Sequence, residues 1–228
     1  MNFLLINSNN TSSFVASIID GNICVKYTND FLDHNEKNAY LKSPDKLVHC
    51  LKYITDKISE ERKSPSIIDA VSIIIGPGSF TGIRVGLSLA KGFADSLEKK
   101  LIPIDNFELI LNQLEIPIDK EKYCILIQAK FPEYYYSLYQ NDTIIERGCL
   151  PIEELRLKTD KNTVIAGNFS DDYIKKLGYF TILEEGNRKS ELDSMLIISE
   201  NKFNKGNLFE SELIEPLYIK EFSYKKLK

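Results

Sequence analysis

The sequence predicts an α/β protein made of two successive lobes, each built as βββαβα, with the second lobe reduced. Apolar segments of strand length recur along the chain and are separated by polar turns. A glycine-rich turn at 76–86 joins an apolar strand to a helix on which small residues recur at every fourth position. Beyond residue 122 the order of elements found in the first half starts again.

The first lobe is expected to open with a meander of three strands. Asp20-Gly21 predicts a tight turn between the second and third strands. Ser43-Pro44-Asp45 predicts a helix start, because serine caps, proline fits the first helical position and an acid stabilises the first turn. The strand, helix and strand that follow predict a parallel, right-handed crossover. The expected strands are 2–7, 12–19, 22–28, 70–75 and 101–104, and the expected helices are 44–62, 80–97 and 106–114.

The second half repeats this order with a smaller helical part. Asn141-Asp142 predicts a hairpin turn, and Pro151 predicts the start of a short helix. Two copies of one order predict an actin-like (ASKHA) double lobe, with lobes at 1–104 and 105–228 and the boundary at Lys99 to Asp105. The expected strands are 123–129, 134–140, 143–149, 163–166 and 180–183, and the expected helices are 170–177 and 192–203.

Composition favours a cytoplasmic protein that does not bind nucleic acid by itself. The 228 residues are 43% hydrophobic, enough for a sizeable core, and the formal net charge is −4 with both signs interspersed. The apolar runs are short and broken by charges, and none follows a basic leader, so neither a membrane span nor a signal peptide is expected. Any role with RNA would therefore need a partner. The lysine-rich tail is interpreted as a solubilising end: Lys220, Lys225, Lys226 and Lys228.

No metal site, disulfide framework or catalytic triad is expected. His34 and His49 have no second ligand at a suitable spacing. The scattered cysteines are typical of buried, reduced thiols, and the tyrosine-rich strand is interpreted as core or sheet surface rather than a base-stacking platform. These residues are Cys24, Cys50, Cys124 and Cys149, and Tyr134, Tyr135, Tyr136 and Tyr139.

The glycine turn admits two interpretations, a phosphate site or a tight turn that allows close helix packing. A glycine turn before a helix is a natural anion site. Here no Gly-Lys-Ser/Thr ends the loop, and neither Asn7-Ser8-Asn9 nor Gln128-Ala129-Lys130 supplies a carboxylate at a strand end. Ser79 or Thr81 is expected to cap the helix. The sequence favours packing, with an ATP-dependent phosphotransferase of the sugar-kinase class as the alternative function and a metal-dependent peptidase as a third.

Gly82, Gly86 and Ala90 form a stripe of small residues on the helix that follows the turn. Glycine inside a helix costs about 1 kcal/mol relative to alanine, so a packing gain must offset it. The gain could come from helix 44–62 or from another subunit. The residues by themselves slightly favour the internal partner.

The run Gly76-Pro77-Gly78-Ser79-Phe80-Thr81-Gly82-Ile83-Arg84-Val85-Gly86, followed by Ala90-Lys91-Gly92, resembles the signature of the TsaB (YeaZ) family, and the segments 164–168 and 215–220 are similar to that family's. The resemblance implies a non-catalytic, actin-like subunit that pairs with a TsaD-like enzyme and a TsaE-like ATPase to make threonylcarbamoyladenosine beside the tRNA anticodon. It implies no cofactor in this chain, ATP and metal on the partners, and tRNA contact only through the complex. Self-association in isolation is left open, and a glycoprotease label would be unsupported.

The resemblance also implies which surface meets the partner. In the family, the helices equivalent to 44–62 and 80–97 form a bundle with the partner, which moves the small-residue stripe toward an intersubunit position. TsaD carries a His-x-x-x-His metal motif where this chain has Asn106 and Ile110, and aspartate is common where Asn7 and Gln128 stand. The expected interface residues are Gly78, Phe80, Thr81, Gly82, Arg84, Val85, Gly86, Leu89, Ala90, Leu47, Leu51 and Ile54.

Overall fold

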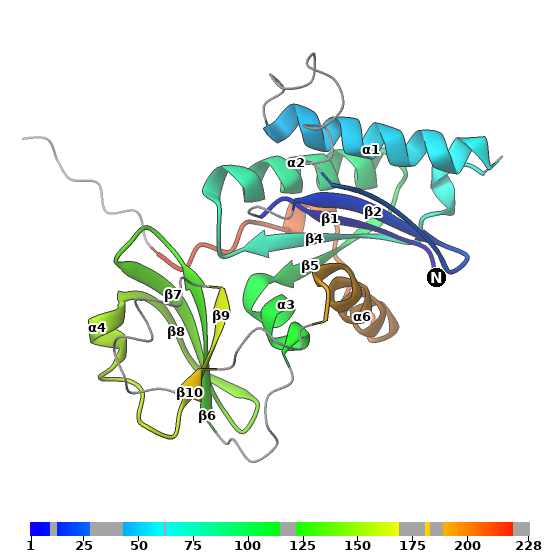
Figure 1. Cartoon of the computed structure of the whole chain (residues 1–228). Helices are drawn as coiled ribbons and strands as arrows, with labels where there is room; N and C mark the ends of the chain where they lie inside the picture. The colour runs from blue at the N-terminus through cyan, green and yellow to red at the C-terminus, as the bar shows by residue number, and fades with distance from the viewer. Residues whose placement is uncertain are drawn as a thin grey trace, which may run out of the picture. The chain divides into compact units, whose positions relative to one another are not determined.

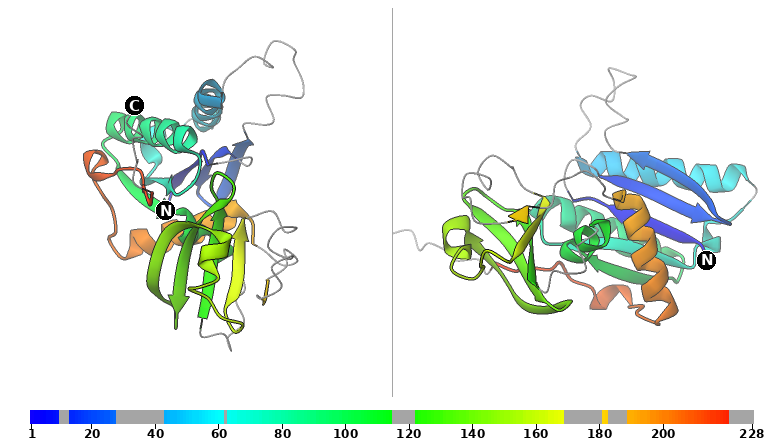
Figure 2. Two further views of the ribbon diagram at one scale, coloured as in Figure 1. Left: turned by 90° about the vertical axis from the view of Figure 1, so that its left-hand side faces the viewer. Right: turned by 60° about the horizontal axis from the view of Figure 1, so that its bottom comes forward.

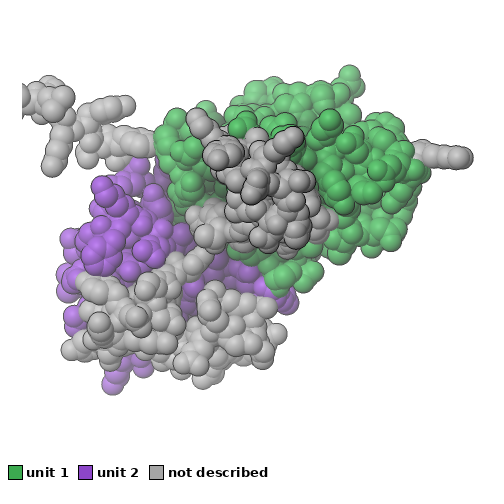
Figure 3. Space-filling view, turned by 45° about the horizontal axis from the view of Figure 1, so that its top comes forward, with its two compact units in different colours: residues 1–109, 190–216 green, residues 110–189, 217–228 purple. Residues whose placement is uncertain are grey.

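The computed structural model describes residues 1–9, 13–27, 43–61, 63–114, 122–168, 181–182 and 189–220. The chain divides into two compact units (Figure 3). Unit 1 consists of residues 1–109 and 190–216, and unit 2 of residues 110–189 and 217–228. Each unit is built on one five-stranded sheet.

The sheet of unit 1 has the order β3-β2-β1-β4-β5 (Figure 1). β1 pairs antiparallel with β2 and parallel with β4, and β4 pairs parallel with β5, so α2 (Phe80–Ser96) is the helix of the parallel crossover that the sequence predicts. Asp20 and Gly21 form the predicted turn between β2 and β3 with positive φ. The strands are β1 (Phe3–Asn7), β2 (Phe14–Ile19), β3 (Asn22–Tyr27), β4 (Ala70–Gly76) and β5 (Lys100–Asp105).

Both faces of this sheet are covered. α1 (Ser43–Glu60) and α2 (Phe80–Ser96) lie on one face, and α6 (Glu191–Asn204) lies along the other (Figures 1 and 2). Because side chains alternate along a strand, Leu4 and Ile6 of β1 pack with the α1–α2 side, while Phe3 and Leu5 pack with the α6 side. α3 (Asn106–Gln113) follows β5 and adds Leu109 to the second cluster.

The sheet of unit 2 has the order β10-β9-β6-β7-β8, so its strands repeat the sequential arrangement of unit 1. This repeat confirms the predicted actin-like (ASKHA) double lobe. α4 (Ile152–Leu155) follows Pro151, as predicted, and packs on one face with Tyr134 and Tyr136. Tyr134 and Tyr136 are thus core residues, whereas Tyr135 is half-buried. The strands are β6 (Lys122–Gln128), β7 (Glu133–Gln140), β8 (Thr143–Pro151), β9 (Val164–Asn168) and β10 (Thr181–Ile182).

The expected lobes, 1–104 and 105–228, differ from these units because the chain returns to unit 1. α6 belongs to unit 1, since Met195 and Ile198 are buried against the β1 and β2 side chains. Phe209 then pairs with Leu101 of β5 through two backbone hydrogen bonds of 2.9 and 3.0 Å. Short 3-10 helices at Pro65–Ile67 and Ser211–Leu213 were not predicted.

Some expectations fall outside the described residues: helix 170–177, the strand end at Thr28, the helix end at Arg62, His34, and the tail lysines Lys225, Lys226 and Lys228. Within the described part of the chain, no helix is long and apolar enough to cross a membrane.

Candidate partner-binding surface

The turn between β4 and α2 is shaped by glycines and closed by a serine cap. Gly76 and Gly78 have φ values of 113° and 153°, where a side chain would be strained. The Ser79 hydroxyl accepts a hydrogen bond from the Gly82 amide at 3.2 Å. Ser79, rather than Thr81, is therefore the residue that caps α2.

Asn9, just after β1, holds this turn from the side. Its side-chain oxygen accepts a hydrogen bond from the Ser79 amide at 2.9 Å, and its side-chain nitrogen donates to the Pro77 carbonyl at 3.2 Å. The Asn106 side chain donates to the same carbonyl at 3.0 Å. A Cβ added at Gly78 would lie 2.0 Å from the Asn9 oxygen. The amide that a phosphate cradle would offer is thus used by the chain's own side chain, which supports the packing interpretation of the turn.

The stripe Gly82, Gly86 and Ala90 faces the interior of unit 1, and Ser8 accounts for its two glycines. A Cβ at Gly82 would lie 2.3 Å from the Ser8 carbonyl oxygen, and a Cβ at Gly86 would lie 2.0 Å from the Ser8 hydroxyl. Gly86 and Ala90 are both buried. Within the chain, the close neighbour of the two glycines is therefore the segment after β1 rather than helix α1. The intersubunit position of this stripe stays a prediction.

Gly92, which lies four residues beyond Ser88, faces outward on the same helix. It is exposed, and a Cβ added there would have no atom within 4 Å. Ser88, one turn earlier, is exposed as well. No described residue of unit 1 packs closely enough to offset the helix-propensity cost of about 1 kcal/mol at Gly92. The side chains on the outer face of α2 are therefore small enough at Ser88 and Gly92 for a second helix to approach closely.

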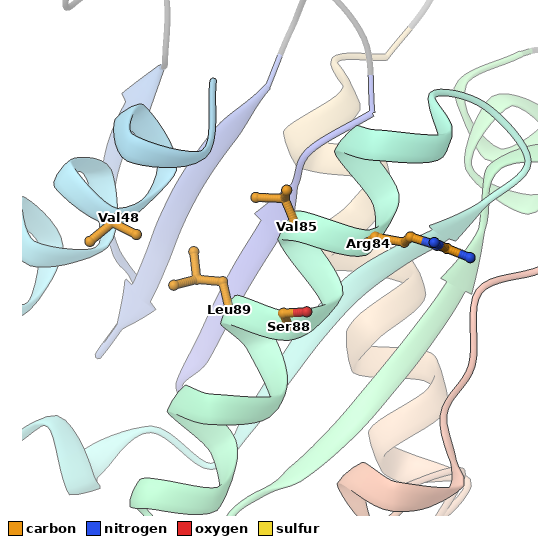
Figure 4. A pocket seen from close by; sticks show the side chains of 5 residues that line it. All are labelled: Val48, Arg84, Val85, Ser88 and Leu89. Atoms are coloured by element: carbon orange, nitrogen blue, oxygen red, sulfur yellow. The ribbon is translucent and has the colours of Figure 1, made fainter. Parts of the chain in front are cut away.

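A shallow groove of about 430 Å³ runs between α1 and α2 (Figure 4). Val85 and Leu89 point from α2 toward α1, and Val48 faces them from α1 (Figure 4). Val48 is 55% exposed, although it is apolar. Ser88 and Arg84 complete the lining of the groove. An open apolar groove between two helices is the kind of surface that a partner helix covers.

At the end of the groove nearest the start of α2, the Arg84 guanidinium stacks on the Phe80 ring. The guanidinium carbon lies 3.8 Å from the ring centroid, and Phe80 is 42% exposed. Arg84 points away from α1 (Figure 4). The stacked pair places an aromatic ring and a positive charge beside the apolar lining of the groove.

The expected interface residues fall into two sets. One set is exposed or half-buried on the α1–α2 surface and the turn, and the other is buried inside unit 1. The buried residues hold the helices on the sheet, since Leu47 and Ile54 are at most 1% exposed in the core cluster with β1 and β4. The accessible residues are Gly78, Phe80, Thr81, Gly82, Arg84, Val85, Leu89 and Leu51, and the buried ones are Gly86, Ala90, Leu47 and Ile54.

The sequence-based list of interface residues omits Val48, Ser88 and Gly92. A signal was available for Val48, because Leu47, Leu51, Ile54 and Ile58 form the apolar face of α1 and Val48 lies one residue off it. An apolar residue that interrupts the polar face of a helix indicates a second contact surface.

The described residues contain no cluster of side chains that could hold a metal ion. Three or more His, Cys, Asp or Glu side chains do not gather anywhere in this part of the chain. Ile110 is buried, and Asn106 is bonded to Pro77. The four cysteines are free thiols, and burial raises the pKa of the Cys124 thiol above its ordinary value, as is typical of an unreactive core cysteine.

The fold and surface together define an actin-like, two-unit α/β protein with an open apolar groove between two helices of its first unit. The family model described as "TsaD: tRNA N6-adenosine threonylcarbamoyltransferase" matches residues 43–166, more than half of the chain. The chain belongs to this family, and curated relatives to which it is similar are named TsaB.

Two curated relatives are named tRNA threonylcarbamoyladenosine biosynthesis protein TsaB. The chain is 25% identical to that of Haemophilus influenzae over 180 residues, which is 70% of this chain and 74% of the relative. It is 28% identical to that of Escherichia coli over 92 residues, which is 40% of each chain.

Two solved structures share the fold at 19% sequence identity. One is YeaZ from Pseudomonas aeruginosa, with a TM-score of 0.66 over 95% of this chain and 100% of that one. The other is an uncharacterized protein with similarity to peptidase YEAZ from Pseudomonas aeruginosa, with a TM-score of 0.70 over 96% of this chain and 99% of that one. At this identity the likeness shows the fold alone.

Proposed function

We propose that this chain is a non-catalytic activating subunit that binds a TsaD-type enzyme through the α1–α2 groove. In this proposal it acts in the cytoplasm with a TsaE-type ATPase to form threonylcarbamoyladenosine beside the anticodon of tRNA. The observation that carries the proposal is the open apolar groove on α1 and α2 in a chain whose relatives are TsaB proteins. A TsaD-type subunit belongs to the same protein family, so a related helix pair is a natural occupant of the groove.

The groove exposes apolar side chains to water. Val48, Val85 and Leu89 present side chains to water across one groove, and covering them would release the cost of exposing them. Exposed Ser88 and Gly92 let a partner helix approach closely, and the Phe80–Arg84 pair offers the aromatic and cationic contacts that are enriched at interfaces.

The remaining parts of the proposal assign chemistry to the partners. ATP and metal are expected on the TsaE-type and TsaD-type subunits, because the described residues of this chain gather no ligand cluster. With a net charge of −4, the chain is expected to meet tRNA only within the complex. A second copy of the chain is an alternative occupant of the same groove when the partner is absent, and self-association is left open.

Gly92 provides the test, because a side chain there touches nothing in the folded chain. Gly92→Leu should weaken the Kd for the purified TsaD-type subunit of the same organism by about tenfold or more, since its bulk separates the helices. Gly92→Ala is the matched control, because it improves helix propensity similarly but adds only a methyl group, and it should bind like the wild type. Titration calorimetry measures both variants.

Two results would contradict the proposal. One is unchanged partner binding by both Gly92→Leu, which adds bulk to the outer face of α2, and Val48→Asp, which adds a charge to the groove. The other is magnesium-dependent ATP hydrolysis by the isolated chain, which would favour the phosphotransferase alternative.

A further inference from the structure

A chain of buried asparagines connects the end of β1 to the start of α2. The Asn7 side-chain nitrogen donates a hydrogen bond to the Glu191 carboxylate at 3.0 Å, and the Asn7 side-chain oxygen accepts one from the backbone N–H of Asn9 at 3.0 Å. The Asn9 side chain then bonds the Ser79 amide and the Pro77 carbonyl. Asn7 is 2% exposed and Asn9 is 4% exposed. Burying such polar groups is tolerated only because they are hydrogen-bonded to one another.

The part of this network that matters for binding is the pair of bonds from Asn9 to the glycine turn. Gly76 and Gly78 adopt positive φ and restrict the backbone little, so the turn does not fix the start of α2 by itself. The Asn9 side chain bonds the turn on both sides of Gly78, at 3.2 Å to Pro77 and at 2.9 Å to Ser79.

The first turn of α2 carries Phe80, whose ring stacks on the guanidinium of Arg84 one turn further along the helix. Phe80 follows directly after the capping residue Ser79, whose amide is bonded to Asn9. A rotation of this first turn would therefore move the Phe80 ring and separate it from the guanidinium that lies 3.8 Å away.

We propose that Asn9 is a positioning residue for partner binding: its side chain locks the first turn of α2 so that Phe80 and Arg84 meet the partner in one fixed orientation. This inference rests on the proposed function, and it adds a residue that does not itself lie on the binding surface. Asn9 acts by preorganisation, since ordering the turn before binding removes that cost from the binding step.

The experiment compares Asn9→Ala with Asn2→Ala, a matched control at the opposite end of β1. The Asn2 side chain also makes one donated and one accepted bond, to the Ile67 carbonyl and from the Asp20 amide, each 3.1 Å long. It lies far along the strand from α2, so its loss affects stability without releasing the turn. Asn9→Ala should weaken the Kd for the purified TsaD-type subunit by about tenfold, or about 1.4 kcal/mol, and Asn2→Ala should leave it unchanged.

Two further measurements separate positioning from loss of stability. Hydrogen exchange of amides 79–82 in the isolated, folded chain should accelerate by about fivefold in Asn9→Ala and not in Asn2→Ala. In a double-mutant cycle, Arg84→Ala should weaken binding in the wild type and have much less effect in Asn9→Ala, because the displaced Phe80 ring no longer holds the Arg84 guanidinium in its stacked orientation.

The outcomes distinguish the two proposals. If the wild-type chain binds and Asn9→Ala binds equally well, or if the effects of Asn9→Ala and Arg84→Ala simply add, the positioning role is refuted. If the wild-type chain does not bind the TsaD-type subunit, the proposed function is refuted, and the exchange rates of the isolated chain still decide whether Asn9 orders the turn.

Discussion

Two glycines of helix α2 should respond in opposite ways to the same substitution. Gly86 and Gly92 both lie inside the helix, so replacing either with alanine gains about 1 kcal/mol of helix propensity. At Gly92 the new methyl group meets no atom within 4 Å. At Gly86 it would lie 2.0 Å from the Ser8 hydroxyl oxygen and 2.6 Å from the Ser8 Cβ, well inside the 3.4 Å at which ordinary contact begins.

The structure sets the size of each effect. Gly92→Ala should stabilise the chain by the full propensity gain, about 1 kcal/mol, which raises Tm by about 2–4 °C for a chain of this length. At Gly86 the overlap calls for the upper end of the overpacking range, about 3 kcal/mol, because Ser8 is buried. After the propensity gain is subtracted, Gly86→Ala should destabilise by about 2 kcal/mol and lower Tm by about 4–8 °C.

Thermal unfolding followed by circular dichroism measures both values on purified protein. A third variant identifies the cause: in Ser8→Gly the overlapping atoms are gone, so adding Gly86→Ala to it should be neutral or stabilising. If Gly86→Ala is as stable as Gly92→Ala, or remains equally damaging without the Ser8 side chain, the internal explanation of the stripe is refuted.

Three further predictions concern burial and charge. Leu47→Ala should destabilise by about 2–5 kcal/mol because Leu47 is 1% exposed, whereas Val48→Ala, at a position 55% exposed, should stay within about 0.5 kcal/mol in urea denaturation. The hydrogen bond from Lys158 holds the pKa of the Glu146 carboxyl below its ordinary 4.5. Glu146→Gln should therefore lower the free energy of unfolding by about 0.5 kcal/mol at pH 7, and this difference should fade as the pH falls below 4.5. A difference between wild type and variant that stays constant across this pH range would contradict the prediction. Burial raises the pKa of the Cys124 thiol, so Ellman's reagent at pH 8 should react with this thiol only after unfolding. Rapid labelling of Cys124 in the native chain would contradict this prediction.

Most of the fold is predictable because it depends on local patterns. Apolar alternation predicts the strands, Asp20-Gly21 predicts the β2–β3 hairpin, and Ser79 predicts the start of α2. The place of α6 is not predictable in this way, because Met195 and Ile198 are as compatible with the second sheet as with the first. Their location depends on which sheet face lacks a cover, which is a property of the folded chain.

The candidate surface likewise has a part that local patterns predict and a part that depends on contacts between distant segments. The apolar periodicity of α1 identifies Leu47 and Ile54 as packing residues, and the structure buries both. The small stripe predicts a close neighbour but contains no information on its identity, which is Ser8. Asn9 gives no sequence signal either, because its role comes from a turn that is distant in sequence.

The return of the chain to unit 1 has a consequence for biosynthesis. Phe3, Leu5 and Ile74 form part of a sheet face that α6 covers, and α6 is translated only after all of residues 110–189. While the ribosome makes residues 110–189, that face of the nascent chain is exposed to solvent and to other proteins. Unit 1 therefore cannot close until α6, residues 191–204 of the 228, has been translated, and a message truncated before codon 191 yields a product with an uncovered apolar sheet.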